Sequence, residues 1–391
     1  MSPWSIAMST APSRRLGFLT AASFVIVAAS GAAFGQPGEP TSVETLGEAL
    51  YFDTNLSINR TQSCATCHSP EFGFADPRGG AASLGADGKS LGDRNAPTAA
   101  YARFSPAFSI TKGKAVGGQF HDGRAADLKE QAGGPPLNPG EMAMTSKAQV
   151  LERLRENPAY VRAFPALFGA GVLDNADTAY DAMTEAIARF EQTDLFAPFD
   201  SKYDRHLRGA YKMTAEEDLG MTLFFSTQFT NCNLCHQLRS MPAAEKETFT
   251  NYEFHNIGVP VNAELRAANG KGKRFVDHGL MENPKTKGAA QDGKYKTPTL
   301  RNVAVTGPYM HNGAFKDLET VIRFYNKYNS TAESAQINPE TGKPWGRPEV
   351  AKTLSLKELE TGPALDAKRI KALVAFLKTL TDARYEHLLK E

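Results

Sequence analysis

The chain has 391 residues, of which 22% are charged, and its formal net charge is +1. This length is sufficient for two or three domains with substantial apolar cores. The near-zero charge argues against nucleic acid, or a polybasic contact with a membrane surface, as the main partner.

Residues 1–35 are typical of a secretory signal peptide. Arg14 and Arg15 form a basic start, residues 16–33 are almost uncharged and largely apolar, and small residues close the segment. The alternative is an uncleaved membrane anchor, because the apolar run approaches the length that spans a bilayer. We expect cleavage, export to the periplasm, and a mature protein with no stable membrane span.

Apolar residues at helical spacing predict a mostly α fold. In residues 148–160, for example, Val150, Leu151 and Leu154 would share one face of a helix. The predicted helices cover residues 148–160, 177–191, 215–225, 317–328 and 367–380. Few strands are predicted, and the segments 76–98, 133–140 and 267–294, rich in Gly and Pro, are expected to be long loops, which in compact domains are usually functional.

All four cysteines belong to two Cys-x-x-Cys-His motifs, at residues 64–68 and 232–236. In this motif both cysteines form thioethers with a haem, and the adjacent histidine is held where its ring coordinates the iron. The competing interpretations are a redox cysteine pair and a zinc site. A zinc site does not explain why a histidine immediately follows both pairs in an exported chain. The predicted attachment residues and iron ligands are Cys64, Cys67, His68, Cys232, Cys235 and His236.

The two motifs are 168 residues apart, which predicts one haem in each of two domains. We therefore expect two cytochrome c-like haem domains with long loops that cover the haem edges. The N-terminal haem domain would comprise residues 36–205, and the C-terminal haem domain residues 206–391.

Longer motifs resemble the bacterial di-haem cytochrome c peroxidase and MauG family. Residues 119–131, together with Pro135 and residues 138–142, carry one part of the resemblance, and residues 297–303 and 307–313 carry another. The motifs follow the family order from about residue 45 to residue 380. The resemblance implies a di-haem peroxidase, an oxidoreductase that uses hydrogen peroxide at one of its two haems.

The resemblance also implies the residues of the peroxide site. In this family the glutamate of the Asn-Pro-x-Glu-Met segment is the distal acid–base residue, which here is Glu141, and Gln131 and Pro135 match other residues of the same pocket. Glu141 would move a proton between the two peroxide oxygens, so that cleavage of the O–O bond releases water rather than hydroxide. From the residues alone, Glu141 also fits a helix start favoured by the helix dipole.

A structural calcium ion is a further implication of the resemblance. Asn95, Thr306 and Pro308 match family positions that bind calcium between the haem domains. Thr306 and Pro308 would contribute backbone carbonyls, which suit a hard ion that prefers oxygen ligands. From the residues alone, Asn95 indicates only a turn.

Two positions favour the MauG-like branch of the family. Many of the peroxidases place a distal histidine after the first motif, but no histidine lies between His68 and His121, so the first haem should have an open iron position. The typical peroxidases ligate the second haem with a methionine fourteen residues after the histidine that here is His311, and this count reaches Tyr325. A phenolate ligand stabilises oxidised iron. The alternative is a core aromatic, since Tyr325 continues an apolar helical stripe.

A third position distinguishes this chain from the family pattern. The family usually has tryptophan between the haems, at the position that here is His121. An imidazole is harder to oxidise than an indole. His121 could relay protons, bond a haem propionate or fill space, and the sequence leaves these three roles open.

The predicted activity is that of a MauG-like di-haem c-type peroxidase. Hydrogen peroxide would react at the His68 haem, and the oxidising equivalents would be shared with the Tyr325 haem as a bis-ferryl-like state. They would then be withdrawn from an aromatic residue, expected to be Trp, of a periplasmic partner protein. Maturation of a Trp-derived cofactor and the conversion of Trp to kynurenine by MbnH-type enzymes both fit.

Two alternatives belong to other functional classes. A cytochrome c peroxidase would reduce hydrogen peroxide to water with electrons from a small cytochrome c or cupredoxin. A non-catalytic electron carrier would lose nothing on replacement of Glu141. The residues do not identify the partner protein.

Overall fold

The computed structural model describes residues 39–239, 241, 243–286 and 288–389. The predicted signal peptide, residues 1–35, lies outside the described residues. In the described part, helices predominate and the strands form three two-stranded antiparallel sheets, so the mostly α fold is confirmed. No helix there is both long and apolar enough to cross a membrane.

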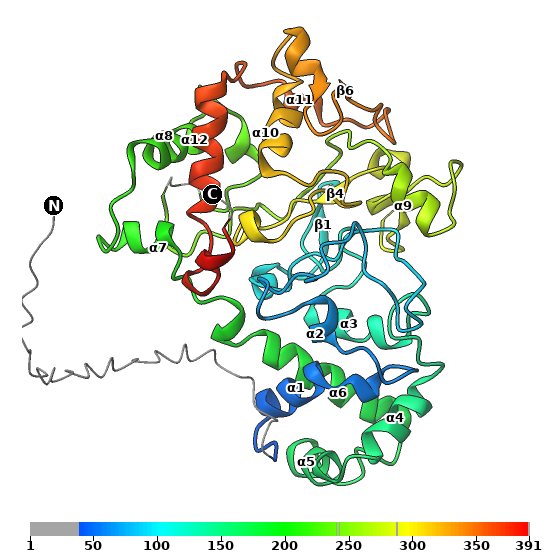
Figure 1. The fold of residues 1–391 in the computed structure, drawn as a ribbon. Helices are drawn as coiled ribbons and strands as arrows, with labels where there is room; N and C mark the ends of the chain where they lie inside the picture. The colour runs from blue at the N-terminus through cyan, green and yellow to red at the C-terminus, as the bar shows by residue number, and fades with distance from the viewer. Residues whose placement is uncertain (1–38, 240, 242, 287, 390–391) are drawn as a thin grey trace, which may run out of the picture. The chain divides into compact units, whose positions relative to one another are not determined.

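The helices and strands follow one another along a chain with long loops (Figure 1). The α-helices are α1 Val43–Phe52, α2 Cys64–Cys67, α3 Leu128–Ala132, α4 Lys147–Arg155, α5 Pro158–Phe168, α6 Ala176–Glu191, α7 Lys202–Leu207, α8 Ala215–Phe225, α9 Ala263–Ala268, α10 Leu318–Asn326, α11 Leu356–Leu359 and α12 Ala367–Lys378. The strands are β1 Ser109–Thr111, β2 Lys114–Val116, β3 Phe254–His255, β4 Tyr295–Lys296, β5 Ile337–Asn338 and β6 Lys343–Pro344.

The helix predicted over residues 148–160 is wrong as a single element. The chain forms α4 and α5 instead, separated at Asn157. The Asn157 side chain accepts a hydrogen bond from the backbone N–H of Ala159, and Pro158 is the first residue of α5. Proline has no N–H with which to continue a helix but is favoured at the first helical position. The other four predicted helices are confirmed as α6, α8, α10 and α12.

In two helix crossings a glycine lies very close to a backbone carbonyl of the other helix. In the crossing of α1 with α6, a Cβ atom on Gly47 would lie 1.9 Å from the carbonyl oxygen of Ala186. In the crossing of α8 with α12, a Cβ atom on Gly220 would lie 1.9 Å from the carbonyl oxygen of Ala372. The first helix of each pair, α1 or α8, precedes a Cys-x-x-Cys-His motif in the chain. Figure 1 shows the members of each pair side by side. Only glycine permits backbones to approach so closely.

The two main clusters of buried apolar residues come from different halves of the chain. The largest buried cluster runs from Leu46 to Phe199, and a second cluster runs from Tyr203 to Leu380. Contacts nevertheless join Pro37–Glu391 into one compact unit. The division into haem domains near residue 205 therefore stays a prediction.

We predict that Gly220→Ala destabilises the protein, because the added methyl group must push α8 away from α12. Overpacking of this kind costs about 1–3 kcal/mol of unfolding free energy. Urea denaturation of the haem-loaded protein measures the change. Gly92→Ala is the control, since the nearest atom to a Cβ there is 3.7 Å away. Equal stability of the two variants would contradict the close crossing.

Candidate functional site

The first Cys-x-x-Cys-His motif borders a cavity of about 870 Å³. A capping box between Ser63 and Thr66 begins the short helix α2, which carries Cys64 and Cys67 one turn apart on the same face. Both thiols and the ring of His68 line this cavity, which we name the first cavity. In the described structure the four cysteines form no disulfide, so each thiol is available for a thioether.

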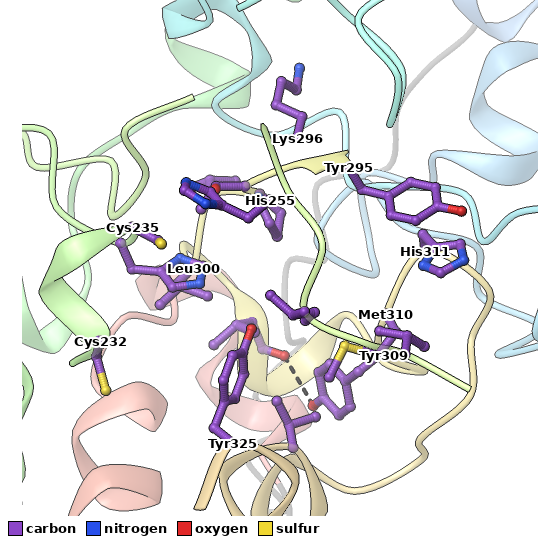
Figure 2. A pocket seen from close by; sticks show the side chains of 18 of the residues that line it. Cys232, Cys235, His255, Tyr295, Lys296, Leu300, Tyr309, Met310, His311 and Tyr325 are labelled. Carbon is purple, nitrogen blue, oxygen red and sulfur yellow. Dashed lines mark hydrogen bonds between the residues drawn. The ribbon is translucent and has the colours of Figure 1, made fainter. Parts of the chain in front are cut away.

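The second motif borders another cavity, of about 320 Å³, which we name the second cavity. Cys232, Cys235 and His236 line it, and so does Tyr325 from α10. In Figure 2 the hydroxyl of Tyr325 points toward the space beside Cys232 and Cys235. Both cavities have the size range of cofactor pockets.

The two motif histidines have the same tautomer. The Nδ1–H of His68 donates to the carbonyl of Phe74 at 3.3 Å, and that of His236 donates to the carbonyl of Phe249 at 3.0 Å. Burial lowers the pKa of His68, and it lowers the pKa of His236 to about 4, so both rings are neutral. A carbonyl fixes the donor at Nδ1, which leaves the Nε2 lone pair for a metal. The donor set therefore fits two c-type haems.

The three residues predicted for the peroxide site lie together in the first cavity: Glu141, Gln131 and Pro135. Glu141 lies in a turn rather than at a helix start, so the helix-dipole interpretation is wrong. The Nδ2 of Asn138 donates to Glu141 Oε1 at 2.7 Å. Burial raises the pKa of Glu141, against the attraction of Arg124 and the hydrogen bond from Asn138. The carboxyl group is thus held in place and retains its proton more readily than an exposed one.

One set of residues lines both cavities and forms the wall between them. This shared wall consists of residues 95–98, Ala102, residues 119–121 and Asp277. His121 belongs to it, as the resemblance implied. Its Nε2–H donates to the carbonyl of Asn95 at 2.9 Å, and burial lowers its pKa to about 4. The neutral ring has only this N–H, so none is left to bond a haem propionate.

The predicted calcium ligands Asn95, Thr306 and Pro308 all line the second cavity. The Nδ2 of Asn95 donates to the carbonyls of Gly80 and Ala81 at 3.3 and 3.4 Å, so its Oδ1 is free of those bonds. Among the described residues, no group of three or more His, Cys, Asp or Glu side chains is arranged to hold a metal. A site made of an amide and backbone carbonyls is a different donor set, and its occupation stays a prediction.

A buried charge cluster beside the wall was not predicted from the sequence. The guanidinium of Arg94 pairs with Asp122 and with Asp277, each at 2.6 Å, and with Glu282 at 2.9 Å. The two aspartates hold the pKa of Arg94 far above its usual value, despite its burial. The only local signal was that Arg94 precedes Asn95 and Asp122 follows His121.

This helical chain with two Cys-x-x-Cys-His cavities is a di-haem cytochrome c, and comparisons define its family. Residues 41–212 match the family described as di-haem cytochrome c peroxidase. The chain is 55% identical over 382 residues to the methylamine utilization protein MauG of Paracoccus denitrificans, covering 96% of this chain and 98% of that protein. It therefore belongs to the di-haem cytochrome c peroxidase and MauG family, and it is a MauG-like enzyme that carries two c-type haems.

More distant relatives include peroxidases. The cytochrome c peroxidase Ccp of Escherichia coli is 35% identical over 76% of this chain and 56% of that protein. The crystal structure of the diheme peroxidase BthA from Burkholderia thailandensis has a TM-score of 0.78 at 30% identity, covering 90% of this chain and 89% of that one. A MauG-like protein associated with microbial copper homeostasis has a TM-score of 0.64 at 30% identity, covering 89% and 91%.

We predict that each motif attaches its own haem. The double variant Cys64→Ser/Cys67→Ser should keep one covalent haem, because serine forms no thioether. The mass of the denatured protein shows how many haems remain attached. The matched double variant Cys232→Ser/Cys235→Ser should retain the other haem. A Cys64/Cys67 variant that still carries two covalent haems would contradict the assignment.

Proposed function

We propose that this MauG-like enzyme reacts with hydrogen peroxide in the first cavity and oxidises an aromatic side chain, of the Trp class, in a periplasmic partner protein. The observation that carries the proposal is the position of Tyr325, whose ring lines the second cavity together with His236. The 55% identity to a MauG protein and the apolar, uncharged character of residues 16–33 also support it. When bound, the two haems supply the redox chemistry by accepting the oxidising equivalents of peroxide.

The chain's own acid–base residue in the first cavity would be Glu141. Its carboxylate takes the proton from one peroxide oxygen and returns it to the other, which leaves as water. Asn138 fixes the orientation of the carboxyl group. Gln131 of α3 and Pro135 just after it line the same cavity, and His68 of the first motif presents its Nε2 there. No other histidine lies between His68 and His121, so no imidazole from this segment blocks the peroxide position.

The second cavity would be closed by two protein ligands, His236 and Tyr325. Within the described residues, no group hydrogen-bonds the Tyr325 hydroxyl, so the oxygen is free to bind a metal. Burial raises the pKa of the free phenol, and coordination to iron would displace its proton. A phenolate is a hard anion that stabilises oxidised iron, which suits a store for an oxidising equivalent.

A calcium ion at Asn95, Thr306 and Pro308 would hold the shared wall in place. Asn95 is already central to this wall, since its carbonyl accepts from His121 and its N–H donates to the carbonyl of His311 at 2.7 Å. Oxygen ligands on both halves of the chain would tie the wall to the loop that precedes α10.

We predict that Glu141→Gln slows the reaction with peroxide, because an amide cannot transfer the proton. Loss of a general acid–base group costs about 10²- to 10⁴-fold in rate. Stopped-flow absorbance of the haems after mixing with hydrogen peroxide measures it. Glu152→Gln, at an exposed position of α4, is the control. An unchanged rate in Glu141→Gln would remove Glu141 from the mechanism and favour an electron carrier.

We predict that the resting ferric protein gives one high-spin and one low-spin EPR signal. In Tyr325→Phe the low-spin signal should become high-spin, because residue 325 would no longer supply a phenolate oxygen to the second iron. Tyr328→Phe is the matched control, since its hydroxyl donates to the carbonyl of Ile257 at 3.0 Å. Two low-spin haems in the unmodified protein would overturn the open first site. Rapid turnover with reduced cytochrome c would instead support the cytochrome c peroxidase alternative.

A further inference from the structure

A buried tyrosine–carboxylate pair borders the second cavity. Tyr101 follows the wall segment 95–98, lines this cavity and is 1% exposed. Its hydroxyl donates to Oδ1 of Asp382 at 2.6 Å, the short distance of a charge-assisted hydrogen bond. The proposed peroxide chemistry uses neither residue.

The protein holds Asp382 as a fixed proton acceptor. Its side chain is 1% exposed, and its Oδ2 accepts from Nδ2 of Asn302 at 2.8 Å. Its backbone N–H donates to Oδ1 of the same asparagine at 2.8 Å, so both ends of the contact are fixed. Burial raises the pKa of Asp382 to about 6, against the hydrogen bonds from Tyr101 and Asn302. The carboxylate is thus a stronger base than an exposed aspartate.

Tyr101 differs from the other described tyrosines that line the second cavity. The hydroxyls of Tyr295 and Tyr309 donate to backbone carbonyls, of Asp277 and Val303 respectively, and a carbonyl does not take up a proton. The hydroxyl of Tyr252 has no partner within the described residues. Among these described tyrosines, Tyr101 donates to a carboxylate oxygen at 2.6 Å, whereas the carboxylate near the Tyr295 hydroxyl, that of Asp277, is already paired with Arg94.

The shared wall itself contains no easily oxidised side chain, and Tyr101 lies next to this wall. The wall carries His121, whose imidazole is hard to oxidise, and Phe120, which has no ionisable group. Tyr101 lies three residues after Thr98 and its ring faces one of the two cavities that this wall separates. A phenol that can release its proton is far easier to oxidise than one that cannot, because no buried radical cation remains.

We infer that Tyr101 is a redox-active residue that donates an electron to the peroxide-oxidised haems while its phenolic proton moves to Asp382. The O–H bond of Tyr101 breaks, one electron reduces a haem, and the proton forms the carboxylic acid of Asp382. The product is a neutral tyrosyl radical that holds one of the two oxidising equivalents of peroxide. Reversal of the same transfer returns that equivalent to the haems. This inference rests on the proposed reaction with peroxide.

The test is EPR of the haem-loaded protein, freeze-quenched after mixing with hydrogen peroxide in the absence of a partner protein. A neutral tyrosyl radical should form in the unmodified protein, and incorporation of ring-deuterated tyrosine should narrow its signal. Tyr101→Phe should abolish the signal. Tyr203→Phe is the matched control, because Tyr203 is equally buried but donates to the carbonyl of Ala244; it should leave the signal unchanged.

A second variant separates a redox role from a structural one. Asp382→Asn retains a group that accepts the hydrogen bond but is a far weaker base, so the radical yield should fall. An unchanged yield in Asp382→Asn would overturn the proton transfer. ENDOR of the unmodified protein should detect an exchangeable proton hydrogen-bonded to the radical oxygen, which needs no variant to fold.

The outcomes distinguish this inference from the proposed function. If peroxide leaves the haem absorbance unchanged in the unmodified protein, the proposed function itself fails. If the haems respond but no tyrosyl signal forms, or the signal persists in Tyr101→Phe, the role of Tyr101 is overturned and the peroxide chemistry stands.

Discussion

The segment of residues 95–98 lines both cavities and lies between the two Cys-x-x-Cys-His sites. Asn95 is the central residue, because its carbonyl accepts from His121 and its backbone N–H donates to the carbonyl of His311. The preceding Arg94 is anchored by Asp122 and Asp277. Buried charges are costly to desolvate, so they persist only where each has a partner, and removing one partner is strongly destabilising. These contacts hold the start of the wall segment in place.

This shared wall lies between two sites that need different side chains in the proposed function. The first must admit peroxide, and the second must be closed by protein ligands. The first cavity is lined by the buried carboxyl group of Glu141, which we propose as the acid–base group of the reaction with peroxide. The second is lined by His236 and Tyr325, which would hold the iron of the second haem in the proposed function. The histidines themselves are prepared in the same way, by a hydrogen bond from Nδ1 to a backbone carbonyl. In the proposed function, the difference between the two haem sites thus comes from Glu141 and Tyr325 and not from the attachment motifs.

The same kind of close helix crossing occurs in both halves of the chain. Gly47 against Ala186 and Gly220 against Ala372 bring a helix next to each haem motif by the same close approach. No repeat is visible in the sequence beyond the two motifs, because a crossing of this kind requires one glycine and a few apolar residues. The two helix crossings are therefore alike although the sequences that form them are not.

Local patterns in the sequence were sufficient for the attachment chemistry and for four of the five predicted helices. Both are local properties, set by residues within a few positions of each other. The resemblance to the family implied roles for Glu141, Tyr325 and His121, and each of them lines a cavity in the structure. The break between α4 and α5 was missed because apolar spacing continues across Asn157, whereas the cap and the following proline end the helix.

The sequence by itself determined that the chain carries two covalent haems on a mostly α fold, since five adjacent residues define each attachment site. Only the tertiary structure decided which residues separate the haems and which side chains surround them. Tyr101 and Asp382 are 281 positions apart, and Arg94 and Asp277 are 183 apart. No local pattern encodes such pairs, because a hydrogen bond between distant residues depends on how every intervening element packs.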